Sequence, residues 1–284
     1  GQVSFMHAYN DVTAQIIQGG VRRGANMGML NINHPDVLRF AVAKLDEWSL
    51  TNFNISLAVT NDFMEKIELD KKFVTDDSIP EEVVEEIRLA EQNRSADVKL
   101  KEVEIGVKKL YEWAKANQEG EGYDLINPRN GLSTMKLNTY KVFNLITRLA
   151  WQFGDPGLVF IDRMNDKNSN PVPSVGKIEA TNPCGEQPLL PYDACNLGSI
   201  NLAKFIDNEK LNWEGLKETI KKGVHFLDNV VEINQFPVQK IREMVTNSRR
   251  IGIGVMGFAD ALFKLKIKYD SEEGIIWAEK IMKL

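Results

Sequence analysis

Residues 181–190 read Thr-Asn-Pro-Cys-Gly-Glu-Gln-Pro-Leu-Leu. This segment places the thiol of Cys184 two residues from the carboxamide of Asn182 and two residues from the carboxylate of Glu186. In an extended or finger-like segment, alternate side chains project to the same side, so these three groups would share one face. A thiol, an amide and a base that converge are the groups of a catalytic site. The alternative is a buried structural cysteine, because free cysteine is among the most buried residue types.

Composition limits the classes of protein to which the chain can belong. Its 284 residues, 43% hydrophobic and 26% charged, are typical of a globular protein with one large domain or two smaller ones. The net charge of −5 gives no electrostatic footprint for nucleic-acid binding, and no apolar run approaches the roughly 20 residues that span a bilayer. Two cysteines without metal-type spacing indicate a reducing, cytoplasmic setting and no metal site. The chain begins without methionine and ends inside a helical pattern, so we expect it to be a middle piece of a longer polypeptide.

Further motifs extend this pattern along the chain. The segment continues as Pro-Tyr-Asp-Ala-Cys-Asn-Leu-Gly-Ser-Ile-Asn-Leu at residues 191–202. The others are Gly-Gly-Val-Arg-Arg-Gly-Ala-Asn-Met-Gly at 19–28, Thr-Asn-Phe-Asn-Ile-Ser at 51–56, Gly-Asp-Pro-Gly at 154–157 and Arg-Arg-Ile-Gly-Ile-Gly-Val-Met-Gly-Phe-Ala-Asp at 249–260. In this order they closely resemble the large catalytic subunit of ribonucleotide reductases, with wording nearest to the adenosylcobalamin-dependent class II.

The fold class expected from the sequence is α/β. Strands that alternate with helices indicate parallel strands. The resemblance implies part of a ten-stranded α/β barrel, built from two five-stranded parallel halves with a finger loop through the centre. It divides the chain into residues 1–73, the first part of the barrel with an effector-coupling loop, residues 74–122, a charged helical insertion, and residues 123–284, the barrel core with the catalytic finger loop.

The resemblance also implies a reaction and a role for each site residue. The reaction is radical-based reduction of ribonucleotides to 2′-deoxyribonucleotides. Cys184 would carry a thiyl radical, Glu186 would act as general base on the 3′-hydroxyl, and Asn182 would hold the substrate hydroxyls. Cys195 would belong to a redox-active pair whose partner lies upstream of this chain, so Cys184 and Cys195 would not form a disulfide with each other.

Cofactors and partners follow from the same resemblance. It implies adenosylcobalamin, dNTP or ATP effectors, a ribonucleotide substrate and an external thiol reductant of the thioredoxin or glutaredoxin type. It also implies a homodimer, or an assembly with other pieces of the same enzyme, and neither nucleic-acid nor membrane partners.

Two segments are candidates for nucleotide contacts. The resemblance implies that the loop 46–53 couples an effector site to the substrate site through Asp46, Glu47, Trp48, Ser49, Leu50, Thr51, Asn52 and Phe53; without it, the loop is only a polar one with an exposed Trp48. Arg22 and Arg23, flanked by glycines, could meet phosphates, because guanidinium forks match phosphate oxygens. They could equally anchor a turn by pairing with carboxylates.

Residues 74–122 depart from the family pattern. They hold 13 acidic and 7 basic residues. A helix is expected to begin near Pro80, and apolar residues spaced by three and four predict a second one: Leu100, Val103, Val107, Leu110 and Ala114. We expect a two-helix appendage with a solvated acidic face; the alternative is a docking surface for a partner.

Elsewhere the sequence predicts helices and strands at defined positions. Helices are expected at 9–17, 34–45, 61–69, 139–153, 212–231, 237–246, 258–265 and 271–284, and strands at 27–32, 55–59, 158–161 and 249–255.

The alternative functions are a metal-radical, class I catalytic subunit that needs a separate radical-generating subunit, a non-catalytic split-gene or fragment piece that is active only on assembly, and a cysteine hydrolase. The hydrolase would need a histidine near Cys184, which no motif provides. His34, next to Pro35, is expected to cap a helix.

Overall fold

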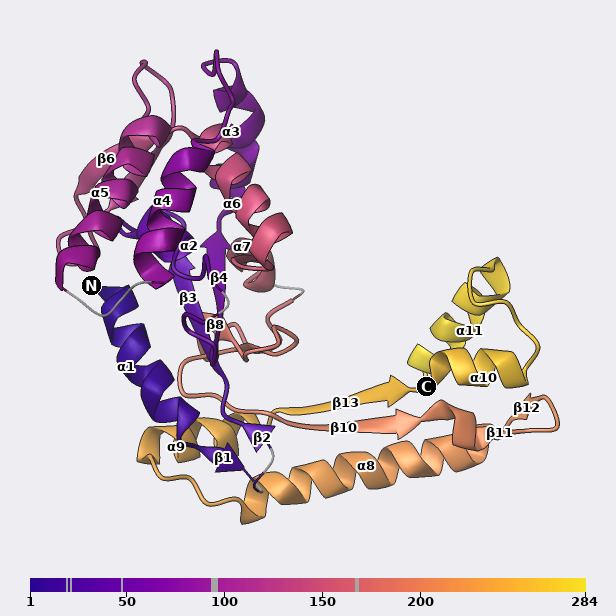
Figure 1. Ribbon diagram of the computed structural model, residues 1–284. Coiled ribbons are helices and arrows are strands. Elements are labelled where there is room, and N and C mark those ends of the chain that lie inside the picture. Colours follow the sequence, from indigo (N-terminus) through magenta and orange to yellow (C-terminus); the bar gives the residue numbers. More distant parts are fainter. Residues whose placement is uncertain (19, 21, 47, 93–96, 167–168) are drawn as a thin grey trace. The chain divides into compact units, whose positions relative to one another are not determined.

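The computed structural model describes residues 1–18, 20, 22–46, 48–92, 97–166 and 169–284 (Figure 1). The chain folds into two compact units, Gly1–Leu190 and Pro191–Leu284, called unit 1 and unit 2 below. Both contain helices and strands, so the α/β class expected from the sequence is confirmed. Among the described residues, no helix is long and apolar enough to cross a membrane.

A three-stranded parallel sheet lies at the centre of unit 1. Its strands are β3 (Asn26–Asn31), β4 (Phe53–Val59) and β7 (Gly157–Phe160), in the order β3-β4-β7. Six of the seven residues of β4 are buried, which is typical of the inner strand of a parallel sheet covered on both faces. Asn54 is its one exposed residue. The strands expected at 27–32, 55–59 and 158–161 are therefore confirmed.

Helices connect and cover these strands (Figure 1). They are α1 (Gln2–Ala14), α2 (Val37–Ala41), α3 (Asn61–Lys71), α6 (Thr139–Phe153) and the short α7 (Ile161–Met164). The Asn138 side chain accepts a hydrogen bond from the Lys141 N–H and caps α6, and Gly154 ends this helix at a φ of 79°. These caps place α6 where the sequence predicts it.

Two predicted helices have different bounds in the structure. The helix expected at 9–17 spans Gln2–Ala14, because Val3, Met6 and Asn10 recur at helical spacing and are buried on one side. The helix expected at 34–45 is reduced to α2, and the residues on both sides of it form turns. Both differences lie at the ends of helices, where the bounds depend on which residues are buried in the tertiary structure.

The insertion forms two helices, α4 (Glu81–Gln92) and α5 (Asp97–Ala114). Their buried residues, among them Ile87 and Leu110, belong to the same hydrophobic cluster as Leu57 of β4 and Leu145 of α6. The two expected helices are therefore present, but they are not an appendage, because their buried residues help to build the core of unit 1. An antiparallel hairpin of β5 (Tyr123–Ile126) and β6 (Ser133–Leu137) follows.

Buried polar groups fix the junctions of the insertion. The Asp70 carboxylate, 1% exposed, accepts hydrogen bonds from the Gly122 and Thr139 N–H groups. The Asn138 Nδ2 donates to the Glu121 carboxylate over 2.7 Å and to the Asp70 carbonyl. Each buried acceptor is thus satisfied by a donor from another segment, as buried polar groups require.

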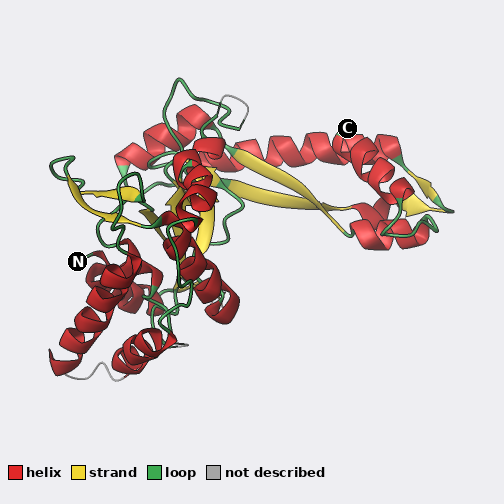
Figure 2. Ribbon diagram, turned by 90° about the horizontal axis from the view of Figure 1, so that it is seen from above, coloured by secondary structure: helices red, strands yellow, loops and turns green. Residues whose placement is uncertain are grey.

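Unit 2 is built around two parallel strands, β10 (Asn196–Asn201) and β13 (Ile251–Met256). The long helix α8 (Trp213–Ile233) runs along this pair in Figures 1 and 2. The remaining elements are η1 (Leu202–Phe205), β11 (Ile206–Asp207), β12 (Lys210–Leu211), α9 (Gln239–Ser248), α10 (Phe258–Lys264) and α11 (Glu272–Met282). All five elements predicted after residue 210 are present within a few residues of the expected bounds.

Across the described residues the sheets hold two or three strands each, and none closes into a barrel. The smaller pairs of unit 1 are β1 (Ile17–Gln18) with β2 (Arg22–Arg23), and β8 (Ala180–Thr181) with β9 (Pro188–Leu189). The β8–β9 pair carries the segment around Cys184.

Candidate functional site

The segment around Cys184 is the tip of a short antiparallel hairpin in unit 1. Ala180 pairs with Leu189 and Thr181 with Pro188, and residues 182–187 form the turn. The Asn182 N–H donates to the Gln187 carbonyl over 3.1 Å, and the Gly185 N–H donates to the Asn182 carbonyl over 3.0 Å. Gly185 has a φ of 85°, a conformation that favours glycine. The segment is therefore finger-like, and it is not extended at its tip.

The three predicted catalytic residues differ in exposure. Cys184 and Glu186 are exposed, so the Cys184 thiol is not part of the core of unit 1. Asn182 is half-buried, and its Oδ1 accepts the Gln187 N–H over 3.0 Å. This bond leaves the Asn182 NH₂ group to donate to a ligand. The structure thus brings the three residues onto one tip of six residues, and within the described chain no hydrogen bond joins Cys184 to Glu186.

Cys195 lies in unit 2, directly before β10. It is half-buried, and its Sγ lies 3.4 Å from the Asn196 carbonyl oxygen. The neighbouring Asp193 side chain is fully buried, and its carboxylate accepts hydrogen bonds from Arg250 over 2.6 Å and Ser248 over 3.0 Å. This buried ion pair ties the segment before β10 to the segment before β13. Neither cysteine forms a disulfide.

A second ion pair lies next to it. Arg249 binds Asp228 and Glu232, both over 2.8 Å. The hydrogen bond from Arg249 holds the pKa of the Asp228 carboxyl below its usual range. All three side chains are substantially exposed, so this pair contributes less to stability than the buried Asp193 pair.

The loop 46–53 is held by its own first residue. The Asp46 carboxylate accepts hydrogen bonds from the Trp48 N–H over 2.8 Å and from the Ser49 hydroxyl over 3.0 Å. Leu50 is 1% exposed with a φ of 51°, so it anchors the turn in the core. Trp48 is 80% exposed, as the sequence predicts. Thr51 follows on the loop, and Phe53 is the first residue of β4.

Asn52 and Glu47 are the remaining two members of the loop. Asn52 is buried, its N–H and its side-chain amide both donate to Asn10 of α1, and its carbonyl accepts the Asn26 N–H. Glu47 lies outside the described residues.

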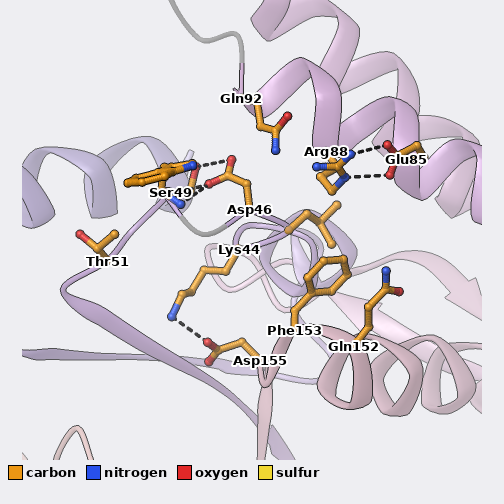
Figure 3. A pocket seen from close by; sticks show the side chains of 12 residues that line it. Lys44, Asp46, Ser49, Thr51, Glu85, Arg88, Gln92, Gln152, Phe153 and Asp155 are labelled. Atoms are coloured by element: carbon orange, nitrogen blue, oxygen red, sulfur yellow. Dashed lines mark hydrogen bonds and ion pairs between the residues drawn. The ribbon is translucent and has the colours of Figure 1, made fainter.

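A cavity of about 800 Å³ opens beside this loop (Figure 3). Two ion pairs lie in its wall, Lys44 with Asp155 over 2.7 Å and Arg88 with Glu85. Lys44 also donates to the Phe53 carbonyl, so it links the loop to the turn before β7. The lining is polar and comes from the loop, from α4 of the insertion and from the end of α6: Lys44, Leu45, Asp46, Trp48, Ser49, Thr51, Glu85, Arg88, Gln92, Gln152, Phe153 and Asp155.

Arg22 and Arg23 form strand β2. It pairs with β1 through Gln18 with Arg22 and Ile17 with Arg23. The Arg23 side chain is exposed and has no carboxylate within ion-pair distance among the described residues. The Arg22 side chain lies outside the described part of the chain. Likewise, no group of three or more His, Cys, Asp or Glu among the described residues could hold a metal ion.

The sequence alone does not indicate a role for two asparagines of this site. Asn54 donates to the Pro183 carbonyl, next to Cys184, and Asn165 binds Ile178 at the base of the hairpin. The available signals are weak: an asparagine inside an apolar strand, which is disfavoured by propensity, and an asparagine just beyond the carboxyl end of a buried strand.

Comparison with known proteins decides the family. Residues 1–284 match the family described as "Ribonucleotide reductase, barrel domain". The chain belongs to this family. The resemblance inferred from the motifs is thereby confirmed.

The curated relatives agree with the family and with the cobalamin-type wording. The chain is 41% identical over 284 residues to the vitamin B12-dependent ribonucleoside-diphosphate reductase of Thermoplasma acidophilum, covering 99% of this chain and 30% of that protein. It is 37% identical to the protein of the same name from Mycobacterium tuberculosis, covering 100% of this chain and 33% of that protein. A ribonucleoside-diphosphate reductase subunit alpha from Chlamydia pneumoniae is 28% identical over 290 residues, with 99% of this chain and 25% of that protein covered. The chain thus spans about a third of its first two relatives.

Proposed function

We propose that the protein carrying this chain reduces ribonucleotides to 2′-deoxyribonucleotides for DNA synthesis, with a thiyl radical on Cys184. The observation that carries this proposal is the exposed Cys184 on the hairpin tip, between Asn182 and Glu186, in a chain of the ribonucleotide reductase barrel family. The names of the relatives that are 37–41% identical support the same activity.

The chemistry of the substrate explains why a thiol is needed. A 2′-hydroxyl is a poor leaving group until a radical forms at the neighbouring C3′. In the proposed reaction the Cys184 thiyl takes the 3′ hydrogen atom, so an S–H bond forms as the C–H bond breaks. Glu186 takes the proton of the 3′-hydroxyl, and the Asn182 NH₂ donates to a substrate hydroxyl oxygen. The 2′-hydroxyl takes a proton from a thiol of the redox pair that contains Cys195 and leaves as water.

Two electrons and two protons, all from a dithiol, complete the balance. Cys195 and a partner cysteine from elsewhere in the protein supply both electrons and become a disulfide, and Cys184 returns its hydrogen atom to C3′. An external thiol reductant of the thioredoxin or glutaredoxin type restores the pair. The half-buried position of Cys195 beside the buried Asp193–Arg250 pair supports this role, because it holds the sulfur on a fixed segment.

Adenosylcobalamin is the radical source that we propose. When bound, it supplies a radical that removes a hydrogen atom from a thiol. The chain fits this requirement at Cys184, whose exposed side chain is accessible to such a group. The vitamin B12-dependent names of the relatives favour this source over a separate metal-containing subunit.

We propose that the chain supplies part of a ten-stranded barrel and that other segments pair with its open strand edges. An assembly with a second copy is supported by helix α1, where Phe5, Tyr9 and Val12 share one side and are 71%, 66% and 62% exposed. An exposed apolar stripe of this kind marks an interaction surface. Sedimentation of the complete protein tests the homodimer.

The nucleotide contacts are further parts of the proposal. We propose that loop 46–53 responds to dNTP or ATP effectors, supported by the polar cavity beside it and by its link through Asn52 to α1 and β3. The exposed Arg23 side chain, which has no carboxylate within ion-pair distance among the described residues, supports a phosphate contact for the Arg22–Arg23 pair.

The test is deoxyribonucleotide formation by the complete protein, with and without adenosylcobalamin. We expect product only with the cofactor and a thiol reductant. Activity without cobalamin that needs a metal-containing subunit would identify the class I alternative, and activity that appears only on mixing polypeptides would identify a split enzyme. No product under any of these conditions would refute the proposed function.

A further inference from the structure

The finger hairpin carrying Cys184 is too short to hold itself in place. Its ladder consists of two residue pairs, Ala180 with Leu189 and Thr181 with Pro188. An isolated two-stranded hairpin is at best marginally stable in water, and this one is shorter than an ordinary strand. The position of Cys184 must therefore depend on contacts from outside the hairpin.

The base of the finger is bound by one carboxamide. The Oδ1 of Asn165 accepts the Ile178 N–H over 2.7 Å, and its Nδ2 donates to the Ile178 carbonyl over 2.9 Å. The same Nδ2 donates to the Ile161 carbonyl over 3.0 Å. Asn165 thus satisfies both backbone groups of one residue, as a neighbouring strand would. Ile178 is 3% exposed and lies two residues before β8.

A second asparagine supports this base. Asn170 is 2% exposed, and its Nδ2 donates to the Gly176 carbonyl over 2.9 Å. Its Oδ1 accepts the Val172 N–H over 3.0 Å. The segment 176–178 is therefore bound at two carbonyls and one N–H by side chains from the segment that follows α7. A carboxamide carries an NH₂ donor and a separate acceptor oxygen, and this arrangement uses both.

The tip of the finger is bound from the sheet. The Nδ2 of Asn54 donates to the Pro183 carbonyl over 2.5 Å. Pro183 stands between Asn182 and Cys184, and as a proline its carbonyl is its only backbone hydrogen-bonding group. Asn54 is the single exposed position of β4, so a rigid central strand presents one amide to the tip.

We propose that Asn54 and Asn165 are positioning residues for Cys184: Asn165 fixes the base of the finger and Asn54 fixes the peptide unit before the thiol. This inference rests on the proposed function, because hydrogen-atom transfer needs the reacting atoms roughly 3–3.5 Å apart. A misplacement of about 1 Å can cost about 100-fold in rate. Substrate binding depends on other groups, so the loss falls on kcat.

The test uses the complete protein and four variants. Asn54→Asp keeps the shape of the side chain and removes the donor, Asn54→Gln keeps the donor on a longer side chain, and Asn165→Ala removes the clamp at the base. Asn117→Ala is the matched control, because the Asn117 Nδ2 also donates to a backbone carbonyl, that of Lys115, at a site outside the finger. The readouts are kcat, KM and hydrogen exchange of the amides in residues 176–190.

We expect kcat to fall by about 10- to 100-fold in Asn54→Asp and Asn165→Ala, with KM within about twofold of the wild type. Asn54→Gln should recover part of kcat, and Asn117→Ala should match the wild type. Exchange of the Ile178 amide should accelerate in Asn165→Ala, and exchange of the Gly185 and Gln187 amides should accelerate in Asn54→Asp.

Unchanged exchange and unchanged kcat in both variants would overturn the inference, as would a rise of KM with kcat unchanged. If Asn165→Ala does not fold, the Asn54→Asp variant still tests the role of Asn54 at the tip, because Asn54 is exposed. Hydrogen exchange of the finger amides can be measured whether or not the protein is catalytically active. A complete protein that forms no deoxyribonucleotide refutes the proposed function, while its exchange pattern still shows whether these asparagines hold the finger.

Discussion

Unit 1 and unit 2 differ in how completely they bury their apolar side chains. In unit 1 a single hydrophobic cluster joins the sheet, the crossover helices and the insertion, and it contains Leu38, Ile87, Leu125 and Leu145. In unit 2 the cluster around Leu202 is small, with six buried members: Leu202, Ile206, Leu211, Leu216, Ala261 and Ile281. A unit with its own core can fold around it, whereas a unit with a small core depends on other segments for cover.

The strands of unit 2 show the same dependence. Leu197 of β10 and Val255 and Met256 of β13 are 50%, 42% and 52% exposed. Parallel strands are normally buried on both faces, so exposed apolar residues on this parallel pair support the proposal that other segments of the protein pack against it. This agrees with a chain that spans about a third of its first two relatives.

The two cysteines, one in each unit, also differ in their surroundings. Cys184 is exposed on a tip that asparagine side chains hold from outside, and Cys195 is half-buried before a strand, beside a buried ion pair. A thiol that must meet both a substrate and a radical source needs to be accessible and well positioned. A thiol that delivers electrons and is then regenerated needs a fixed backbone. The predictions below separate these two roles.

The largest expected effect is that of Cys195→Ser on repeated turnover. Serine cannot supply electrons, so the variant should lose turnover with the physiological reductant. It should also give no deoxyribonucleotide in a single turnover, but it should still cleave the 3′ C–H bond of the substrate, because that step needs only Cys184 and the finger. Product per enzyme and tritium release from 3′-tritiated substrate measure these two outcomes, and sustained turnover in this variant would remove Cys195 from the redox pair.

Glu186→Gln should lower kcat by roughly 10²- to 10⁴-fold, the usual contribution of a general base. Glu179→Gln is the matched control, since Glu179 is also exposed and precedes the same hairpin, and it should leave kcat unchanged. Steady-state kinetics of the complete protein compares them. Equal activity of the two variants would exclude Glu186 as the base.

Asp193→Ala should lower the free energy of unfolding of unit 2 by roughly 3–5 kcal/mol, because it leaves the Arg250 charge buried without its partner. Glu214→Ala should cost less than about 1 kcal/mol, since the Glu214–Lys217 pair is exposed. Urea unfolding followed by tryptophan fluorescence reports on this unit through Trp213 and Trp277, which stack at 6.0 Å. Equal losses in the two variants would show that burial of the Asp193 pair does not matter.

The smallest expected effect is a pH dependence in unit 1. Burial raises the pKa of Tyr111 and of Tyr123 above the ordinary value of about 10. The folded state therefore keeps these protons at a pH where the unfolded state releases them. Their contribution to stability is fully present below pH 10 and is lost as the pH rises above it.

Tyr123→Phe isolates this effect, because the buried Tyr123 hydroxyl has no hydrogen-bond partner in the described structure. Above pH 10 the unfolding free energy of the variant should fall less steeply, by up to about 1.4 kcal/mol per pH unit. Urea unfolding between pH 9 and pH 11 measures the difference. Identical slopes would contradict the assignment.

Local signals in the sequence predict the elements that depend on local chemistry. Helix α6 lies where the Asn138 cap and Gly154 place it, and the buried run of β4 appears as a strand. The family and the finger-like segment around Cys184 also follow from the sequence, because the motif is long and specific.

The rest depends on contacts between distant residues. Asn54 and Pro183 are 129 positions apart, so nothing near either one announces their hydrogen bond. The insertion has the charge of a solvated appendage, and only the packing of Ile87 and Leu110 into the cluster shows that it belongs to the core. The same holds for Asp193, whose partner Arg250 is 57 residues away.

The most direct test of the central claim is cleavage of the 3′ C–H bond by Cys184→Ser and Cys195→Ser variants of the complete protein, followed as tritium release from a 3′-tritiated ribonucleotide. Both are assayed with adenosylcobalamin and an external thiol reductant. The account predicts no tritium release from Cys184→Ser, because serine cannot carry the radical, and tritium release without deoxyribonucleotide from Cys195→Ser, because the radical forms but the two electrons are missing. Tritium release or deoxyribonucleotide from Cys184→Ser at the level of the wild type would contradict it.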